Sequence, residues 1–329
     1  MTTSFFPVTY STLACDALVT RVLPSFEVTS PTSCKLWHRG LSDVYLVETS
    51  EKNYVLRVSH AHWRTKSEID FELELLVFLQ QRQIPVARPL RTIDEQLSIE
   101  IEAPEGKRYA ALFDFAPGQV PLGDLSKDQG QKLGETIGRL HEVATDFHSL
   151  ANRQPLTLDY LLDDSLEAIA PFLQHRPQDH DYLVETISEV KQKLQGMPKD
   201  PPFWSVCWGD PHSGNVHFTD DNHVTLFDFD QCGYGWRAFE IAKFLHVSAR
   251  TGMQKTVRDS FLEGYQTVQP VTPEEEDSMQ PFSQAAHIWQ WSIGLKSAKV
   301  HDNCRLDDSY FSHRLRQLKM LSSPAWELF

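Results

Sequence analysis

The chain has 329 residues, of which 41% are hydrophobic and 11% aromatic, and its formal net charge at pH 7 is −14. This composition is that of a folded, acidic, soluble protein with enough apolar side chains for a large core, and the length predicts two lobes. Because a surface of this charge repels phosphate backbones and anionic lipids, we expect neither nucleic acid nor a membrane as a partner.

The sequence also bears on the compartment. No uninterrupted apolar run approaches the roughly 20 residues that a transmembrane helix requires. The N-terminus lacks the basic and apolar regions of a secretory signal. Five cysteines are scattered without a CxxC pair, as is typical of reduced thiols. We therefore expect a cytoplasmic protein.

The first third of the chain is predicted to be strand-rich with one helix. Apolar residues recur at intervals of three and four along residues 66–81, which indicates a helix that Pro85 and Pro89 end. Runs of β-branched and aromatic residues predict two hairpins. The expected strands are residues 43–49, 54–58, 96–103 and 109–115.

The sequence Ala116-Pro-Gly118 marks a lobe boundary, and the pattern beyond it is mostly helical. Ser126 is a suitable N-cap for a helix over residues 126–142. We predict an N-terminal lobe over residues 1–117 and a C-terminal lobe over residues 118–329. Further helices are expected at residues 158–170, 182–194, 238–248, 256–266 and 281–300.

Residues 208–230 carry the pattern with the most chemical content. Two short strand-like runs flank a four-residue polar turn and should form an antiparallel hairpin. Because a hairpin returns its ends to one place, Asn215 and Asp228 should lie side by side, with Asp210 on the loop that leads in. Oxygen donors of this kind suit Mg²⁺. The spacing is that of a protein-kinase catalytic loop and its metal-binding aspartate.

Ordinary turn formation is the alternative explanation of these polar residues. The first lobe argues against it, because Arg57 lies on the second strand of a predicted hairpin and Glu72 on the helix that follows. That is the arrangement of a phosphate-holding cation paired to a helix carboxylate. Arginine is always charged and can bind both a phosphate and a glutamate.

These motifs make the chain resemble the kinase-like phosphotransferases, which include aminoglycoside phosphotransferases, choline kinases and type II homoserine kinases. The resemblance covers roughly residues 36–245 and is closest to the branch of homoserine kinase and stress-response kinase A. It implies an α+β, two-lobe protein-kinase-like fold, with an N-terminal antiparallel sheet, one helix and a mainly helical C-terminal lobe. The motifs are Tyr54-Val-Leu-Arg-Val58, Glu72-Leu-Glu-Leu-Leu76, Gly209-Asp-Pro-His-Ser-Gly-Asn215 and Phe227-Asp-Phe-Asp-Gln-Cys-Gly-Tyr-Gly235.

The resemblance implies roles for individual residues of the second lobe. Asp210 would be the catalytic base, and Asn215 and Asp228 would be ligands of Mg²⁺. Asp230 would support these ligands or bind a second metal ion.

In the first lobe the resemblance implies a nucleotide site. Arg57 and Glu72 would fix the phosphates of ATP. Gly40 and Ser42 lie in a short turn between strands that would cover the phosphates. The backbone of Asp114 and Ala116, in the segment between the lobes, would contact adenine.

Two positions depart from the family pattern. Trp208 stands where the family usually has histidine, and an indole can donate a hydrogen bond but cannot accept one. Glu240 stands where the family usually has aspartate, which keeps the charge and alters the reach.

We therefore expect an ATP- and Mg²⁺-dependent kinase that phosphorylates a hydroxyl group, either of a small molecule or of a protein serine or threonine. Two other classes are open. One is a metal-dependent hydrolase that uses Asp210, His212, Asp228 and Asp230. The other is a nucleotide-binding pseudokinase, against which the intact set of Asp210, Asn215 and Asp228 argues.

A more specific hypothesis is that the acceptor is a cation, such as an amino alcohol. The helices of the second lobe carry carboxylates and indoles, which suit an amine through charge pairing and cation–π contact. The alternative is that the acids form a solvated face and the tryptophans belong to the core. The residues are Asp159, Asp163, Asp164 and Glu167, with Trp289 and Trp291.

Overall fold

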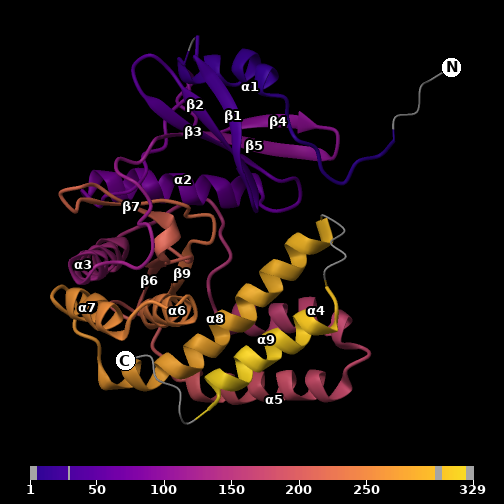
Figure 1. Ribbon diagram of the computed structural model, residues 1–329, viewed down its shortest axis with the longest axis vertical. Coiled ribbons are helices and arrows are strands. Elements are labelled where there is room, and N and C mark those ends of the chain that lie inside the picture. Colours follow the sequence, from indigo (N-terminus) through magenta and orange to yellow (C-terminus); the bar gives the residue numbers. More distant parts are fainter. Residues whose placement is uncertain (1–5, 29, 301–305, 324–329) are drawn as a thin grey trace. The chain divides into compact units, whose positions relative to one another are not determined.

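The computed structural model describes residues 6–28, 30–300 and 306–323. The chain forms two compact units (Figure 1). The first comprises Met1–Pro117 with His148–Arg153, and the second comprises Gly118–Phe147 with Gln154–Phe329. The segment His148–Arg153 thus belongs with the first unit, although the residues before and after it in the sequence belong with the second.

A five-stranded antiparallel sheet forms the first unit, in the order β1-β2-β3-β5-β4. The predicted first hairpin is confirmed, since β2 pairs with β3 and Tyr45 lies opposite Leu56. The second predicted hairpin is also confirmed, by the pairing of β4 with β5. The strands are β1 (Ser33–Arg39), β2 (Ser42–Glu48), β3 (Asn53–Ser59), β4 (Ile99–Ala103) and β5 (Gly106–Asp114).

The long helix of the first unit, α2 (Lys66–Gln81), has the predicted range because its N-terminus is capped reciprocally. Thr65 Oγ1 accepts a hydrogen bond from the N–H of Glu68, and the Glu68 carboxylate accepts one from the N–H of Thr65. A short helix, α1 (Cys15–Arg21), was not predicted. Its Leu18 joins the buried core of the sheet.

The second unit is mainly helical, as predicted, and Ser126 caps its first long helix. Its long helices are α3 (Lys127–Ala144), α5 (Pro177–Leu194), α6 (Arg237–Arg250), α7 (Lys255–Gln266), α8 (Pro273–Val300) and α9 (Asp308–Leu321). The predicted helix at residues 158–170 consists of a π-helical turn (Asp159–Asp163), α4 (Asp164–Ile169) and a 3-10 turn.

The start of α8 differs from the prediction, which placed it at Pro281. The helix begins at Pro273, and Pro281 lies inside it. The reason is a cap at Thr272, whose Oγ1 accepts the N–H of Glu275 while the Glu275 carboxylate accepts the N–H of Thr272. Burial of the side chains of Met279, Phe282 and Ala285 on either side of Pro281 holds this part of the chain in the core despite the internal proline.

Two small antiparallel ladders complete the second unit. The predicted hairpin is confirmed as β7 (Val216–Phe218) paired with β8 (Val224–Leu226). The other ladder, β6 (Trp204–Cys207) with β9 (Gly233–Trp236), was not predicted. The loop that contains Asp210 connects one ladder to the other, from the end of β6 to the start of β7.

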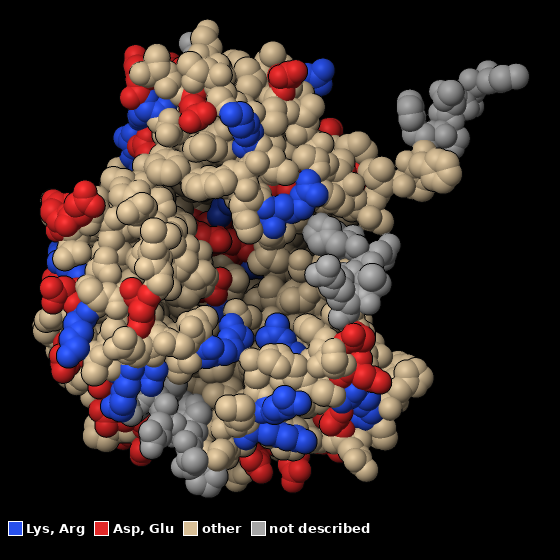
Figure 2. All heavy atoms as spheres, viewed as in Figure 1, with Lys and Arg blue, Asp and Glu red and all other residues tan. Residues whose placement is uncertain are grey.

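Surface charge and hydropathy agree with the composition. Acidic and basic side chains are interspersed over the face in Figure 2. Among the helices of the described residues, none combines the length and the apolarity that crossing a bilayer requires.

Candidate active site

The hairpin β7–β8 brings the expected metal ligands together at its open end. The N–H of Phe227 donates a hydrogen bond to the carbonyl of Asn215 over 3.1 Å, so Asn215 and Asp228 are neighbours. The Asn215 side chain is oriented by its Nδ2, which donates to the carbonyl oxygen of Asp210 over 3.1 Å. Its amide oxygen is then the atom left for a cation.

Asp228 has a left-handed backbone, with φ of 57°, and its side chain is exposed. A non-glycine residue in this region is uncommon, although aspartate tolerates it better than most residues. Asp230, two residues on, is buried at 6% exposure. The two carboxylates therefore differ in exposure: Asp228 is exposed to solvent and Asp230 is buried.

The carboxylate of Asp210 is held by three side chains. Lys243 of α6, which is fully buried, places Nζ 3.0 Å from Oδ1. Gln231 donates from Nε2 to Oδ2 over 3.2 Å, and His212 places Nε2 at 3.6 Å from the same oxygen. Lys243 Nζ also donates to the carbonyl of Gly209 and to Oε1 of Gln231. The lysine thus fixes both the loop and the carboxylate.

The same contacts set the protonation of Asp210. Burial alone would raise its pKa, but the charge of Lys243 and then the contact with His212 outweigh burial and hold the pKa below its usual range. Asp210 is therefore an ionised carboxylate at neutral pH.

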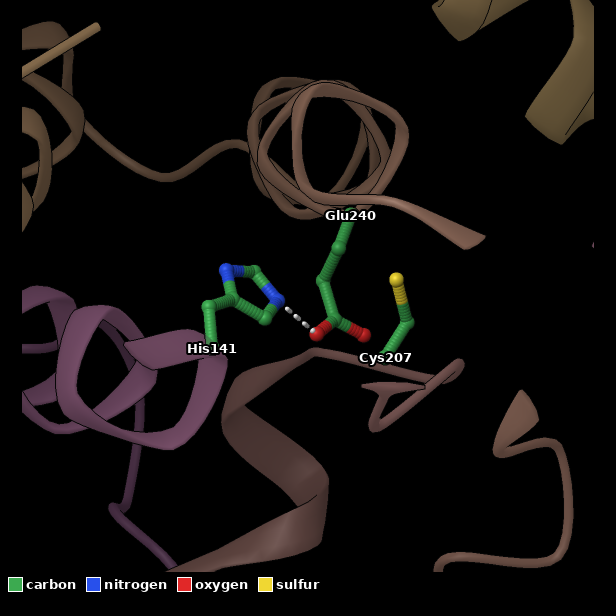
Figure 3. A group of neighbouring side chains, drawn as sticks. All are labelled: His141, Cys207 and Glu240. Atoms are coloured by element: carbon green, nitrogen blue, oxygen red, sulfur yellow. Dashed lines mark hydrogen bonds and ion pairs between the residues drawn. The ribbon is translucent and has the colours of Figure 1, made fainter. Parts of the chain in front are cut away.

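Glu240 anchors the loop from the side of α6 (Figure 3). Its Oε1 accepts the N–H of Gly209 over 2.5 Å, and its Oε2 accepts the N–H of Trp208 over 3.0 Å. Oε2 also contacts Nε2 of His141 at 2.7 Å, and Nδ1 of His141 is 3.0 Å from the hydroxyl of Tyr265. Glu240 therefore has the reach to bind two successive main-chain amides.

His141, Cys207 and Glu240 offer ligand atoms within 4.8 Å of one another (Figure 3). Their contacts do not suit a metal ion. Both oxygens of Glu240 and both ring nitrogens of His141 already have partners. Burial, and then the charge of Glu240, raise the pKa of Cys207, so its thiol stays protonated, and it contacts the carbonyl of Trp236 instead. We read the group as the support of the loop.

Trp208 also supports the loop. Its Nε1 donates to the carbonyls of Phe227 (2.9 Å) and Asp228 (3.0 Å), which ties the loop to the end of the hairpin. The next residue must be glycine: Gly209 has φ of 89°, and a Cβ atom there would lie 2.0 Å from the carbonyl oxygen of Gln231.

In the first unit the structure joins Arg57 and Glu72 in a two-pronged ion pair. Nη1 and Nη2 of Arg57 each lie 2.7 Å from a different carboxylate oxygen. Glu72 is 1% exposed and Arg57 is 13% exposed at the side chain. The guanidinium also lies 5.2 Å from the centroid of the Phe113 ring. Such a pair holds the arginine rigidly in its place on β3.

The turn between β1 and β2 is short, since the N–H of Gly40 donates to the carbonyl of Ser42 over 3.0 Å. Ser42 is buried at 7% exposure. Next to it, Asp43 binds Arg108 at 2.8 Å with both side chains fully buried, and it also accepts a hydrogen bond from Tyr10. This network, which the sequence did not reveal, supports the turn.

The carboxylate of Asp114 forms ion pairs with two side chains of the first unit, those of Lys52 (2.8 Å) and Arg88 (2.5 Å). The N–H of Asp114 donates to the carbonyl of Arg88. Because the main-chain amide of Asp114 already has this partner, only its main-chain carbonyl is left for the predicted contact with adenine. Ala116 is buried at 7% exposure.

The structure supports the alternative to the cation pocket. Trp291 is fully buried, and Trp289 is 2% exposed with Lys243 Nζ already 4.6 Å from its ring centroid. Lys191 neutralises Asp159 at 3.4 Å and Asp163 at 2.5 Å. Asp164 and Glu167 are exposed. The acids form a solvated face, and the tryptophans belong to the core.

The sheet with its arginine–glutamate pair, and the loop with its hairpin-borne oxygen ligands, together define a kinase-like phosphotransferase. The chain belongs to the phosphotransferase enzyme family, which it matches over residues 34–282. The predicted resemblance and the predicted fold class are confirmed.

Individual relatives agree with this membership. An uncharacterised protein of Synechocystis sp. is 54% identical over 324 residues, which are 98% of this chain and 90% of the relative. A solved amicoumacin kinase in complex with AMP-PNP and Ca²⁺ is 20% identical, has a TM-score of 0.77 and covers 91% of this chain and 92% of its own. A microcompartment-associated aminopropanol kinase has the same identity and TM-score and covers 95% and 100%. The two solved structures share the fold.

Proposed function

We propose that the protein is an ATP- and Mg²⁺-dependent kinase that transfers the γ-phosphoryl group to a hydroxyl of a small molecule. The observation that carries the proposal is the juxtaposition in the second unit of an ionised, rigidly held Asp210 with Asn215 and Asp228 at the hairpin end. Relatives of this fold that are named for amicoumacin and aminopropanol support a small-molecule acceptor over a protein serine or threonine.

Asp210 would orient the acceptor hydroxyl and accept its proton. A carboxylate whose pKa lies below its usual range is a weak base. In a loose transition state the proton leaves late, so orientation of the hydroxyl contributes more than basicity. The contacts of Lys243 and Gln231 serve this orientation.

The donor set fits Mg²⁺, because Asn215 offers an amide oxygen and Asp228 an exposed carboxylate, and Asp230, two residues on, is a further predicted metal ligand. Bound Mg²⁺ would supply neutralisation of phosphate charge. Arg57 is held in place by Glu72. It would bind a phosphate through guanidinium N–H groups that do not donate to Glu72. Gly40, Ser42, Asp114 and Ala116 stay predicted nucleotide contacts, and Asp114 would use its carbonyl.

A cytoplasmic location is part of the proposal. It is supported by the free thiols of Cys15, Cys34, Cys207 and Cys232 among the described residues.

Two variants test the assignment by separating binding from transfer. Asp228→Ala should abolish the rise in melting temperature that Mg·ATP produces, because the variant lacks the carboxylate that would hold the Mg²⁺ of the nucleotide. Asp210→Asn should keep that rise while ATP consumption with an active acceptor falls on the order of 10²- to 10⁴-fold.

Asp220→Asn, an exposed turn residue of the same hairpin, is the matched control and should change neither quantity. An unchanged thermal shift in Asp228→Ala would remove Asp228 from the metal site. Phosphate release that needs no ATP would favour the hydrolase, and Mg·ATP binding without transfer to any acceptor would favour the pseudokinase.

A further inference from the structure

Helix α2 carries Glu72, the partner of Arg57 in the first unit. Each carboxylate oxygen of Glu72 lies 2.7 Å from a guanidinium nitrogen of Arg57, which stands on β3. Because a two-pronged ion pair requires a definite geometry of both groups, a shift or a rotation of α2 would break it. The contacts that hold α2 therefore decide where Arg57 presents its charge.

A short segment from later in the chain, His148–Arg153, lies against this helix. The segment contains neither helix nor strand. It belongs to the first unit, although the chain enters it from α3 and leaves it toward α4, which both belong to the second. Three of its residues form hydrogen bonds with α2.

The most buried of these three residues is Arg153, at 8% exposure. Its Nη1 donates a hydrogen bond to the carbonyl oxygen of Glu68 over 3.3 Å. In an α-helix this carbonyl also accepts the N–H of the residue four positions on, which here is Glu72. Arg153 therefore binds α2 at the main-chain group to which Glu72 itself is bonded, and a main-chain acceptor moves only with its helix.

The two other contacts lie nearer the surface. Ser149 Oγ donates to Oε2 of Glu74 over 2.5 Å, and the N–H of Asn152 donates to Oγ of Ser67 over 2.6 Å. Ser149 Oγ also accepts the N–H of Ala151 over 2.9 Å, which closes a local turn. The segment thus contacts α2 in its first turn and again about two turns further on.

These two contacts come from the side of α2 that faces away from β3. Successive residues of an α-helix are about 100° apart, so Ser67 and Glu74, seven positions apart, lie almost on one line along the helix. Glu72 is turned away from that line by roughly 140° to 160°. Since Glu72 points at Arg57 on β3, the helix is held by β3 on one side and by the segment on the other.

We propose that the segment His148–Arg153 is a positioning element of the nucleotide site: it fixes α2 from the side opposite to β3 and so keeps Glu72 in place for Arg57. Arg153 is the central positioning residue, and it acts through the helix without contacting the nucleotide. The inference rests on the proposed kinase function, because it is Arg57 that would bind a phosphate of ATP.

Hydrogen exchange of the nucleotide-free protein tests the structural half of the inference. Arg153→Met removes the donor to Glu68 and keeps a long, unbranched side chain. The amides of α2 should then exchange at least roughly five-fold faster, while those of α7 stay unchanged. Ser149→Ala and Ser67→Ala each remove one surface hydrogen bond and should have the same effect in smaller measure, so the test does not depend on the folding of Arg153→Met.

Calorimetric titration with Mg·ATP tests the functional half and needs no acceptor. Arg153→Met should raise the Kd for Mg·ATP roughly ten-fold, because Arg57 loses its fixed direction. A merely structural role would lower the melting temperature and the fraction of protein that binds, and would leave the Kd of that fraction unchanged. Arg153→Lys keeps a charged donor and should restore part of the affinity. Leu150→Ala changes a fully exposed side chain of the same segment and is the matched control.

A double-variant cycle shows whether the effect passes through Glu72. Glu72→Gln weakens the ion pair with Arg57 by itself. Adding Arg153→Met to Glu72→Gln should therefore raise the Kd for Mg·ATP by a much smaller factor than Arg153→Met does in the wild type. Equal factors in the two backgrounds would mean that Arg153 acts by another route, and the inference would be wrong.

The outcomes separate this inference from the proposed function. If α2 exchanges at the wild-type rate in all three variants, or if the Kd for Mg·ATP stays unchanged although α2 exchanges faster, the inference is overturned and the kinase function still stands. If α2 exchanges faster and the Kd rises as expected, while no hydroxyl compound ever receives phosphate, the positioning role stands and the kinase function falls.

Discussion

Lys243 and Asp210 form an ion pair in which the lysine is fully buried and the carboxylate side chain is 15% exposed. A buried charge is tolerated when it is paired, and its partner becomes costly when it is left alone. The lysine has further acceptors in Gly209 and Gln231, so it joins α6 to the loop at three points.

This pairing predicts a stability cycle. Lys243→Met keeps the length of the side chain and leaves Asp210 unpaired, so the free energy of unfolding should fall by roughly 3–5 kcal/mol. Adding Asp210→Asn removes the unpaired charge and should recover part of the loss. Urea unfolding of the two single variants and the double variant measures the coupling. A double variant no more stable than Lys243→Met would show that the two charges do not hold each other.

Sequence reasoning correctly placed side by side those residues of the candidate site that lie close together in the chain. The order Asp210, Asn215 and Asp228 spans one loop and one hairpin, so local strand signals were enough to bring their backbones together. Lys243 and His141 come from helices and reach the loop through packing. A signal for Lys243 existed, because Glu240, Lys243 and His246 recur at intervals of three along residues 238–247 of α6, which are otherwise apolar.

At the scale of elements, the contact between α3 and α7 depends on glycine. A Cβ atom on Gly134 would lie 1.9 Å from the carbonyl oxygen of Phe261, and one on Gly264 would lie 2.0 Å from that of Gln131. Both neighbours are backbone atoms, so neither can move aside without moving its helix. The two helix backbones therefore touch where each helix has a glycine.

Alanine at either position should push the helices apart. We expect Gly134→Ala and Gly264→Ala each to lower the free energy of unfolding by about 1–3 kcal/mol or more, as overpacking of a close contact does. Gly196→Ala is the control, since nothing lies within 4 Å of its Cβ position, and it should be neutral or slightly stabilising. Urea unfolding checks all three. Equal stability of Gly134→Ala and Gly196→Ala would contradict the close approach.

The elements that were predicted well are those with a strong local signal. Helix α2 has the range that its apolar periodicity predicts, and the cap of Thr65 with Glu68 fixes its N-terminus. A cap of the same kind at Thr272 and Glu275 starts α8 upstream of Pro281, whereas a proline by itself predicts a helix start. The ladder of β6 with β9 could not be predicted locally, because each strand has four residues and its partner is distant in the chain.

At the scale of the whole molecule, the acidic balance coexists with fully buried ion pairs. Arg108 binds Asp43 in the first unit, with both side chains at 0% exposure. Arg237 binds Glu275 in the second, at 2% and 1%. Both carboxylates are therefore buried next to a cation, and removing either cation would leave an unpaired buried charge.

Asp43 gives a test of acid stability. Burial would raise its pKa, but contacts with His60, Arg108 and Tyr10 hold it well below its usual range. A carboxyl group with a depressed pKa stabilises the fold above its unfolded pKa of about 4 and loses this contribution as pH falls toward the folded value. Asp43→Asn should therefore be less stable than the wild type at pH 7, and the difference should shrink toward pH 3.

Urea unfolding of both proteins at several pH values measures this gap. Asp94→Asn, an exposed residue of the same unit, should show no such gap at any pH. A gap for Asp43→Asn that stays constant down to pH 3 would mean that the charge of Asp43 does not stabilise the unit.

The anchoring of the loop by Glu240 has a consequence for how the sequence can drift during evolution. Glu240 accepts hydrogen bonds from the main-chain amides of Trp208 and Gly209, and a main-chain amide is present whatever side chain, other than proline, follows it. The side chain at position 208 is therefore not needed for these two hydrogen bonds. An indole can stand there in place of an imidazole, and it donates to the carbonyls of Phe227 and Asp228 instead. Position 240 is more constrained, because in this chain both amides depend on the carboxylate of that one residue.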